Sequence, residues 1–304
     1  MYARFKAFRQ QLSQFLDLTA FEQAPHASHY YTYLGDDILE LKHDQFHNQN
    51  KALWLNVGYW KSAVTYPEAC EALTRLLGEQ AQLSTAHEAL DCGFGFAEQD
   101  LLWLELYPQL RLTGINITPL HVERARMRVH ARGLTERLQL LQGDAAQIPF
   151  EAAHFDRVLA LESAFHFNTR QRFFEEAFRV LRPGGLLAMT DMLPSSHQPE
   201  PHRLQRFTHQ RVYVPRANCY DRLSYEERLR GCGFQGVRVE PITAWTLRGY
   251  ERYVVQRLLG RARDKIQVKL ENELRPTPWG LLEHVAGFAE YVLVVAQKPG
   301  GSHR

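Results

Sequence analysis

Residues 89–97 read ALDCGFGFA, a short apolar run followed by a turn that contains two glycines. The run Ala89–Cys92 has the length and composition of a buried β-strand, and the residues from Glu98 onward have helical periodicity. A strand that enters a glycine-containing turn and then a helix lets the backbone approach a nucleotide closely and points helix N–H groups at it. This stretch predicts an α/β fold that holds a nucleotide-like ligand at the turn.

The spacing of small residues after Cys92 separates the possible cofactors. The dinucleotide fingerprint G-x-G-x-x-G fails, because its third glycine would fall on Glu98. The S-adenosylmethionine pattern G-x-G-x-G places its third small residue at Ala97, which is small enough for a helix to pack on a sheet. Phe94 departs from the pattern, since a small or sulfur-bearing residue is common there. S-adenosylmethionine is therefore the expected cofactor, and an NAD-dependent oxidoreductase is the weakest alternative.

Short apolar runs of strand length alternate with segments of helical period after Ala89, which predicts a parallel sheet. The expected strands are 89–92, 112–117, 138–142, 155–161, 185–191, 237–242 and 290–296. The expected helices are 98–106, 119–132, 170–181 and one that Ser224 would cap, with Glu227 three residues later. We predict a Rossmann-like, doubly wound, seven-stranded sheet with its last strand antiparallel, together with a helical cap.

The chain is expected to divide into three parts. Residues 1–83 are predicted to be an N-terminal helical cap segment, residues 84–298 the Rossmann-like cofactor domain with a helical insertion at about 247–284, and residues 299–304 a disordered tail. The cap should cover the carboxyl ends of the strands, where ligands of α/β sheets bind. Apolar residues at helical spacing near the N-terminus indicate either a lid over the pocket or a helix with peripheral membrane contact.

Composition excludes several classes of protein. The 36 basic and 34 acidic side chains of the 304 residues nearly balance, which gives no support for a nucleic-acid-binding stripe. Apolar runs fall short of the ~20 residues that span a bilayer, and the N-terminus lacks the pattern of a secretory signal. The four cysteines lack metal-type spacing, so we expect reduced thiols in a cytoplasmic protein and no metal site. The low net charge favours a small, largely apolar acceptor, and the oligomeric state stays open.

Two polar residues follow the next strands at the positions that a nucleoside would need. Asn116, about 25 residues after Asp91, can hold ribose hydroxyls if its amide donates as well as accepts. The Asp144 carboxylate can accept from the exocyclic amine of adenine. The residues expected to line the cofactor on this argument are Asp91, Gly93, Gly95, Asn116, Ile117, Asp144, Ala145 and Leu161.

From about residue 55 to residue 191 the chain resembles the small-molecule class I methyltransferases, which include sterol, tocopherol and natural-product sugar O-methyltransferases. The segments that carry the resemblance are NVGYW at 56–60, GINITP at 114–119 and RVLRPGG at 179–185. In that family the aromatic residues of the first segment wall the cofactor site, which adds Tyr59 and Trp60 to the expected contacts. The resemblance is specific for the cofactor and leaves the acceptor open.

The resemblance also implies catalytic residues. Sugar O-methyltransferases of this family have a histidine after the fourth strand and an aspartate after the fifth, and the matching positions are His166 and Asp191. An imidazole suits the removal of a hydroxyl proton, while Asp191 would orient the ring or hold the acceptor. The alternative is that His166 packs between Phe165 and Phe167 and only hydrogen-bonds a loop.

The expected activity is therefore methyl transfer from S-adenosylmethionine to a small apolar acceptor, by O-methylation with His166 as the general base. A C-methyltransferase acting on an isoprenoid or sterol-like alkene is the main alternative. It would pass through a cation and would need aromatic faces and a carboxylate rather than a histidine alone. A non-catalytic cofactor-binding protein is a third possibility, from a different functional class. Glu162, next to the fourth strand, is expected to make a structural hydrogen bond under the cofactor.

Overall fold

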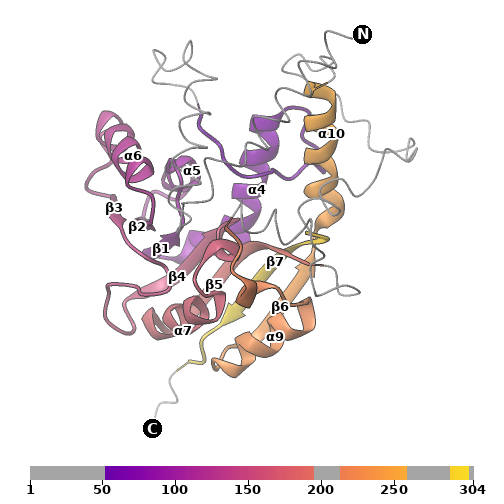
Figure 1. Ribbon diagram of the computed structural model, residues 1–304. Helices are drawn as coiled ribbons and strands as arrows, with labels where there is room; N and C mark the ends of the chain where they lie inside the picture. Colours follow the sequence, from indigo (N-terminus) through magenta and orange to yellow (C-terminus); the bar gives the residue numbers. More distant parts are fainter. Residues whose placement is uncertain (1–51, 195–212, 259–287, 301–304) are drawn as a thin grey trace.

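The computed structural model describes residues 52–194, 213–258 and 288–300 of the chain (Figure 1). Its helices are α4 (Tyr66–Gln80), α5 (Glu98–Leu106), α6 (Pro119–Ala131), α7 (Arg170–Val180), α9 (Arg222–Gly231) and α10 (Leu247–Leu258). Its strands are β1 (Glu88–Cys92), β2 (Arg111–Asn116), β3 (Leu138–Gln142), β4 (Phe155–Leu161), β5 (Leu181–Leu193), β6 (Gln235–Pro241) and β7 (Glu290–Gln297). Short 3-10 turns lie between several of these elements.

The seven described strands form one sheet in the order β3-β2-β1-β4-β5-β7-β6. Strands β3, β2, β1, β4 and β5 pair in parallel, whereas β7 is antiparallel to both of its neighbours, β5 and β6. The predicted doubly wound sheet with an antiparallel last strand is thus confirmed. The order of the strands reverses between β1 and β4, and ligands of such sheets bind beyond the carboxyl ends of the strands at this point.

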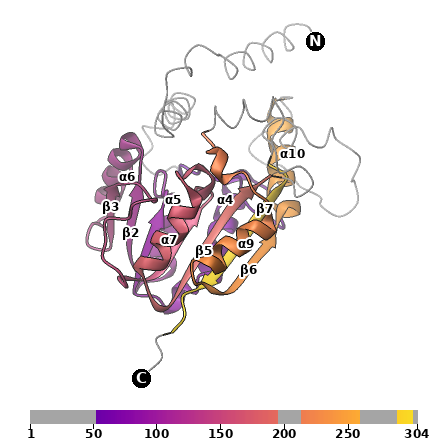
Figure 2. The same cartoon turned by 60° about the horizontal axis from the view of Figure 1, so that its bottom comes forward.

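Two apolar layers hold helices against the two faces of the sheet. One layer joins the sheet to α4, α5 and α6, and the other joins it to α7 and α9. Figure 2 shows α7 and α9 on one side of the strands, with α4 and α5 on the other. Strand β7 contributes Tyr291 and Leu293 to the first layer and Val292 and Val294 to the second. Its burial on both faces is what its almost uninterrupted apolar sequence predicts.

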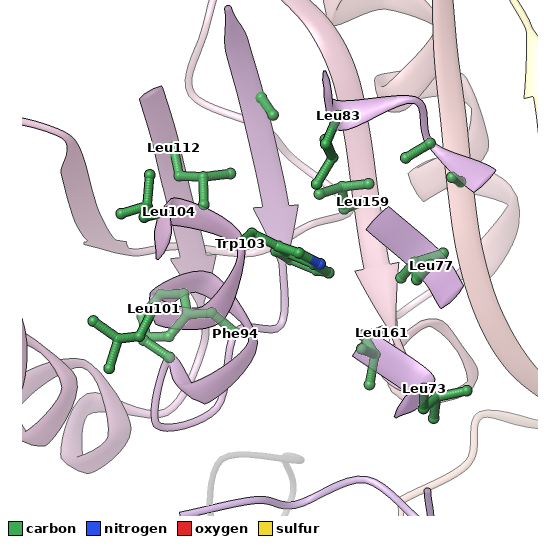
Figure 3. Packing of buried hydrophobic residues seen from close by; sticks show 14 of the residues in the cluster. Leu73, Leu77, Leu83, Phe94, Leu101, Trp103, Leu104, Leu112, Leu159 and Leu161 are labelled. Carbon is green, nitrogen blue, oxygen red and sulfur yellow. The ribbon is translucent and has the colours of Figure 1, made fainter. Parts of the chain in front are cut away.

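Helix α4 packs on the sheet, although it falls inside the segment predicted to be a cap. A capping box starts the helix: Thr65 accepts from the Glu68 N–H, and the Glu68 carboxylate accepts from the Thr65 N–H. Leu73 and Leu77 then enter the core beside Trp103 of α5 (Figure 3), whose indole N–H donates to Thr74 O at 2.9 Å. This apolar face decides the placement, so α4 belongs to a flanking layer rather than to a cap.

Helix α9 begins earlier than the sequence suggested. The predicted N-cap, Ser224, lies inside the first turn, and the N-cap is Asp221. The Asp221 carboxylate accepts from the Ser224 N–H at 2.9 Å. An ionised aspartate accepts this bond more strongly than a serine hydroxyl would, and its negative charge also suits the helix N-terminus.

Several predictions lie outside the described residues. They are the N-terminal part of the cap up to residue 51, the insertion beyond residue 258, and residues 301–304 of the tail. Within the described ranges, no helix is both long enough and apolar enough to cross a membrane.

Candidate active site

The loops that follow β1, β2, β3 and β4 are joined to one another at the same edge of the sheet. The Gly93 N–H donates to Ile115 O at 2.8 Å, and the Gly143 N–H donates to Asn116 O at 3.1 Å. The Ser163 hydroxyl donates to Cys92 O at 2.6 Å. These bonds continue the parallel pairing past the ends of the strands. They bring the predicted cofactor residues of four separate strands to one place.

The turn after β1 has a backbone that requires glycine. Gly93 and Gly95 have φ values of +93° and +56°, which L-residues rarely adopt. A Cβ on Gly93 would lie 2.5 Å from the Ser163 Cβ, and a Cβ on Gly95 would lie 2.8 Å from the Leu55 Cδ1. Ala97 is also left-handed, at +60°, and it forms the N-cap of α5. Neither glycine therefore has room for a side chain, because Ser163 and Leu55 pack against them.

Asn116 and Asp144 lie at the ends of β2 and β3, as predicted. The Asn116 amide donates to Gly95 O and accepts from the Thr118 N–H, with both distances at 3.4 Å. Asp144 is half-buried, and its Oδ1 accepts from the Ala146 N–H at 2.8 Å. Within the described part of the chain, Asp144 Oδ2 has no hydrogen bond. The pair thus offers a weakly held amide and a carboxylate oxygen, the donor and acceptor set that a ribose and an adenine amine need.

Asp91 lies behind the turn rather than on its surface. Its carboxyl is fully buried and accepts from the Gln99 side chain at 3.0 Å. Burial raises the pKa of this carboxyl and that of the Asp100 carboxyl, and the charge of Asp91 raises the pKa of Asp100 further. Both shifts favour the protonated form of these buried acids. In this arrangement Asp91 supports the turn from below.

The other predicted cofactor residues differ in how they can act. Ile117 is half-buried directly after β2, whereas the Ala145 and Leu161 side chains belong to the two core layers. Tyr59 is half-buried. Trp60 is fully buried, donates its indole N–H to Val57 O, and packs against aromatic neighbours. Its ring therefore supports the residues that are expected to face the cofactor rather than facing it.

An irregular segment, residues 53–60, lies along the site and is bonded to the elements on both sides of it; we call it the strap. The Leu53 N–H donates to the Glu98 carboxylate at 2.6 Å, and Arg128 forms an ion pair with the same carboxylate. Further along, the Val57 N–H donates to the Glu162 carboxylate at 2.9 Å. The strap therefore connects the start of α5 with the end of β4 above the glycine turn.

Glu162 makes the structural hydrogen bonds that its sequence position suggested. Its Oε2 accepts from the Val57 N–H and from the Tyr291 hydroxyl, both at 2.9 Å. Desolvation raises the pKa of this carboxyl to about 8, although both hydrogen bonds act to lower it. Its φ of +53° is unusual for a residue other than glycine. An acid that is largely protonated at neutral pH thus anchors the strap.

His166 lies in a 3-10 turn, Ala164–His166, directly after β4. Its ring contacts Phe165, and its Nδ1 lies 3.0 Å from Tyr213 O. A carbonyl oxygen can only accept, so Nδ1 carries the hydrogen in the neutral ring and the lone pair is on Nε2. The loop contact foreseen as the alternative to catalysis therefore exists. It leaves Nε2 as the basic nitrogen.

Asp191 belongs to a different cluster of buried polar groups. Its Oδ2 lies 2.8 Å from Arg170 Nε and accepts from the Tyr225 hydroxyl at 2.9 Å. Its Oδ1 accepts from the Met192 N–H at 2.8 Å. Burial raises the pKa of this carboxyl, and the Arg170 guanidinium acts against that rise. The carboxylate is bonded to these groups and not to the His166 ring.

Sequence reasoning missed Asn218 and Arg170, which connect these two clusters. Asn218 ends a short 3-10 turn, and nothing in RANCY, residues 216–220, marks it as part of a site. In the sequence Arg170 marks only the start of a helix. A fully buried arginine is uncommon unless it is paired, but burial is not visible in the sequence.

Comparison with known proteins shows the family of the chain. Residues 90–189 match the family described as Methyltransferase domain. Erythromycin 3''-O-methyltransferase of Saccharopolyspora erythraea is 38% identical over 210 residues, which are 67% of this chain and 69% of that protein. The chain belongs to the S-adenosylmethionine-dependent methyltransferases.

A second relative of this methyltransferase is the 27-O-demethylrifamycin SV methyltransferase of Amycolatopsis mediterranei. It is 29% identical over 270 residues, which cover 84% of this chain and 95% of that protein. The crystal structure of a geranyl diphosphate C-methyltransferase from Streptomyces coelicolor, with S-adenosyl-L-homocysteine bound, superposes with a TM-score of 0.67. The match covers 91% of this chain and 99% of that one at 13% identity, so it supports the fold alone.

Proposed function

We propose that this methyltransferase transfers a methyl group to a hydroxyl oxygen of a largely apolar small molecule, with His166 as the general base. The observation that carries the proposal is the Nδ1 contact with Tyr213 O, because it leaves the lone pair on Nε2 at the end of β4. The O-methyltransferases among the relatives support an oxygen acceptor. They also favour an acceptor with the bulk of erythromycin or rifamycin rather than a small polar metabolite.

The residues at the strand ends fit the expected cofactor. Asn116 and Asp144 carry the donor and the acceptors that a ribose and an adenine need, and the turn after β1 joins the same edge of the sheet through Gly93. We expect Ile117 and Tyr59 to pack beside them. When bound, S-adenosylmethionine supplies a methyl group on a positively charged sulfur, which is open to attack by an oxygen nucleophile.

The protein's own contribution is positioning and proton removal. Nε2 of His166 would take the hydroxyl proton of the acceptor, which makes its oxygen a stronger nucleophile toward the methyl group. The strap is bonded to the start of α5 and to the end of β4, so we expect it to help position the bound donor and acceptor.

Replacing His166 separates its two possible roles. An asparagine keeps a side-chain N–H near the position of Nδ1, so His166→Asn retains a donor for Tyr213 O and removes only the base. We expect His166→Asn and His166→Ala to lower kcat by about 100-fold or more, with little change in cofactor affinity. Methyl-labelled cofactor, offered with hydroxylated macrolides and with geranyl diphosphate, measures the turnover. Mass spectrometry of the products shows which acceptor is labelled.

Three results would contradict the proposal. Full activity of His166→Asn would leave the histidine as a packing residue. Label on carbon rather than on oxygen would favour the C-methyltransferase alternative. Cofactor binding without turnover on any phenol, lipid or macrolide would favour a non-catalytic protein.

A further inference from the structure

The turn that carries His166 is part of the connection from β4 to α7, residues 162–169. A second segment far away in the sequence, residues 213–221, contacts this connection. Tyr213 contacts the His166 ring through its carbonyl oxygen. Asn218, in the same segment, contacts the main chain on both sides of His166.

The Asn218 side chain has a single favourable orientation. Its amide nitrogen donates to Phe165 O at 3.0 Å and to Phe167 O at 2.8 Å. Its amide oxygen accepts from the Arg170 N–H at 2.8 Å, at the start of α7. Turning the amide over would place oxygen against two carbonyls and nitrogen against an N–H, which is unfavourable on all three sides. Asn218 is 1% exposed, so water does not replace these partners.

The same residue fixes the segment that reaches the imidazole. The Asn218 N–H donates to Pro215 O at 2.8 Å, which closes the 3-10 turn Arg216–Asn218. Tyr213 precedes this turn with a φ of +52°, which is uncommon for a residue other than glycine. The position of Tyr213 O relative to the ring therefore depends on where Asn218 holds its segment.

Asp191 is connected to Asn218 through Arg170. The Arg170 guanidinium donates to Asn218 O at 2.8 Å and to Met192 O at 3.2 Å, while its Nε pairs with Asp191. It also lies over the rings of Tyr220 and Tyr225, 5.0 and 5.2 Å from their centroids. The chain of contacts runs from the end of β5, through the guanidinium, to the residue that clamps the turn of His166.

We propose that Asn218 is a positioning residue that fixes the tautomer and the orientation of His166, and that Asp191 acts on His166 only through Arg170 and Asn218. This inference rests on the proposed role of His166 as the base. It assigns no direct contact with the acceptor to Asp191. The donor half of the Asn218 amide is the part that matters, because it holds the two carbonyls that flank the base.

The test uses Asn218→Asp, which keeps the shape and the acceptor for the Arg170 N–H but replaces the two donated bonds with repulsion. Asn218→Ser, which retains one donor, serves if the aspartate variant does not fold. Asp221→Asn is the control, because Asp221 caps α9 from the same segment without contacting the turn of His166. The first readout is the ¹⁵N spectrum of histidine-labelled full-length protein, with His166 assigned by the signals missing in His166→Asn.

We expect His166 in the unchanged protein and in Asp221→Asn to be the Nδ1–H tautomer. In Asn218→Asp and Asn218→Ser this signature should be lost or mixed with the Nε2–H form. The kcat should fall by about 10-fold to 100-fold while the KM for S-adenosylmethionine stays unchanged. A folded Asn218→Asp protein that keeps the Nδ1–H signature would overturn the inference. The spectrum needs no acceptor, so this result is separate from any failure of His166 to act as the base.

Discussion

Asp144 and Asn116 are both short polar side chains, but the protein holds them to different degrees. One oxygen of Asp144 is taken by the Ala146 N–H at 2.8 Å, which fixes the carboxylate within its own turn. The Asn116 amide makes only long contacts, of 3.4 Å, to Gly95 O, the Thr118 N–H and the His121 ring. A fixed acceptor selects a particular donor on the ligand, whereas a loosely held amide adapts to a pair of hydroxyls. Discrimination for adenine should therefore depend mainly on Asp144.

Replacing Asp144 tests this division. We expect Asp144→Ala and Asp144→Asn each to weaken S-adenosylmethionine binding by about 10-fold to 100-fold, because both remove the acceptor for the adenine amine. Asp144→Asn can still accept from the Ala146 N–H, so its loss of affinity is not caused by an unfolded turn. Glu151→Gln, which removes a charge from an exposed site nearby, should bind normally. Calorimetric titration measures all three, and undiminished affinity of Asp144→Asn would show that adenine is held elsewhere.

The site residues that stand at the ends of strands could be predicted from the sequence, whereas those in other segments could not. Asn116 and Asp144 stand directly after short apolar runs, and in a parallel sheet that position places them at the ligand edge. Asn218 does not follow a strand, and its contact with Phe165 depends on a path that the local sequence does not encode. Asp191 lies within β5 rather than after it, and its buried partner Arg170 was not foreseen.

At the scale of elements, α10 holds the strap in place. Gly249, near its start, lies against Trp60 so closely that a Cβ there would be 2.2 Å from Trp60 Cγ. The Trp60 N–H donates to Trp245 O at 2.6 Å, just before the helix. Tyr253, one turn further along α10, packs its ring against Trp60 and against Tyr66 of α4. The strap is thus fixed from behind by an aromatic cluster that a helix late in the sequence completes.

Two glycine-to-alanine substitutions in helices should have opposite effects. Gly249→Ala would push the Trp60 ring aside, so we expect it to reduce the free energy of unfolding by about 1–3 kcal/mol. A Cβ on Gly231, at the end of α9, would meet no described atom within 4 Å, so Gly231→Ala should be neutral or stabilise by about 0.5 kcal/mol. Denaturant unfolding measures both. A Gly249→Ala protein as stable as its Gly231→Ala counterpart would mean that α10 is not packed on the strap.

The elements themselves were predictable where periodicity and burial agree. The predicted strand 138–142 matches β3 at both ends, and the predicted helix 98–106 matches α5. The start of α9 was missed because both Asp221 and Ser224 are good N-caps, and the choice between them depends on tertiary packing. The cap assignment of α4 was corrected because its amphipathic face fits a lid and a flanking layer equally well in sequence.

For the molecule as a whole, the buried acids of the site differ in whether a positively charged side chain pairs with them. Asp191 is paired with Arg170, and both side chains are almost completely buried. Asp91, Asp100 and Glu162 have no ion pair with a described residue. Burial raises the pKa of each of these three groups, and that of Glu162 reaches about 8. The folded protein thus holds protons at neutral pH that the unfolded chain, with ordinary carboxyl pKa values, releases.

The stability of this methyltransferase should therefore fall as the pH rises from about 5 to about 9. A carboxyl whose pKa is raised by folding stabilises the native state fully below its unfolded pKa, near 4.5 for Glu162. That contribution is lost as the pH rises through the folded value of about 8. The acids whose pKa is lowered by folding, such as Asp156, act in the opposite direction, but below this window.

Glu162→Gln isolates the contribution of Glu162 to this pH dependence. The amide keeps an acceptor for the Val57 N–H and the Tyr291 hydroxyl but does not titrate. We expect the variant to be about as stable as the unchanged protein at pH 5 and more stable at pH 9, by an amount on the order of a few kcal/mol. Chemical unfolding at several pH values gives the two curves. Parallel curves would show that Glu162 is already ionised at pH 5, and the strap would then be anchored by a charged carboxylate rather than by a neutral acid.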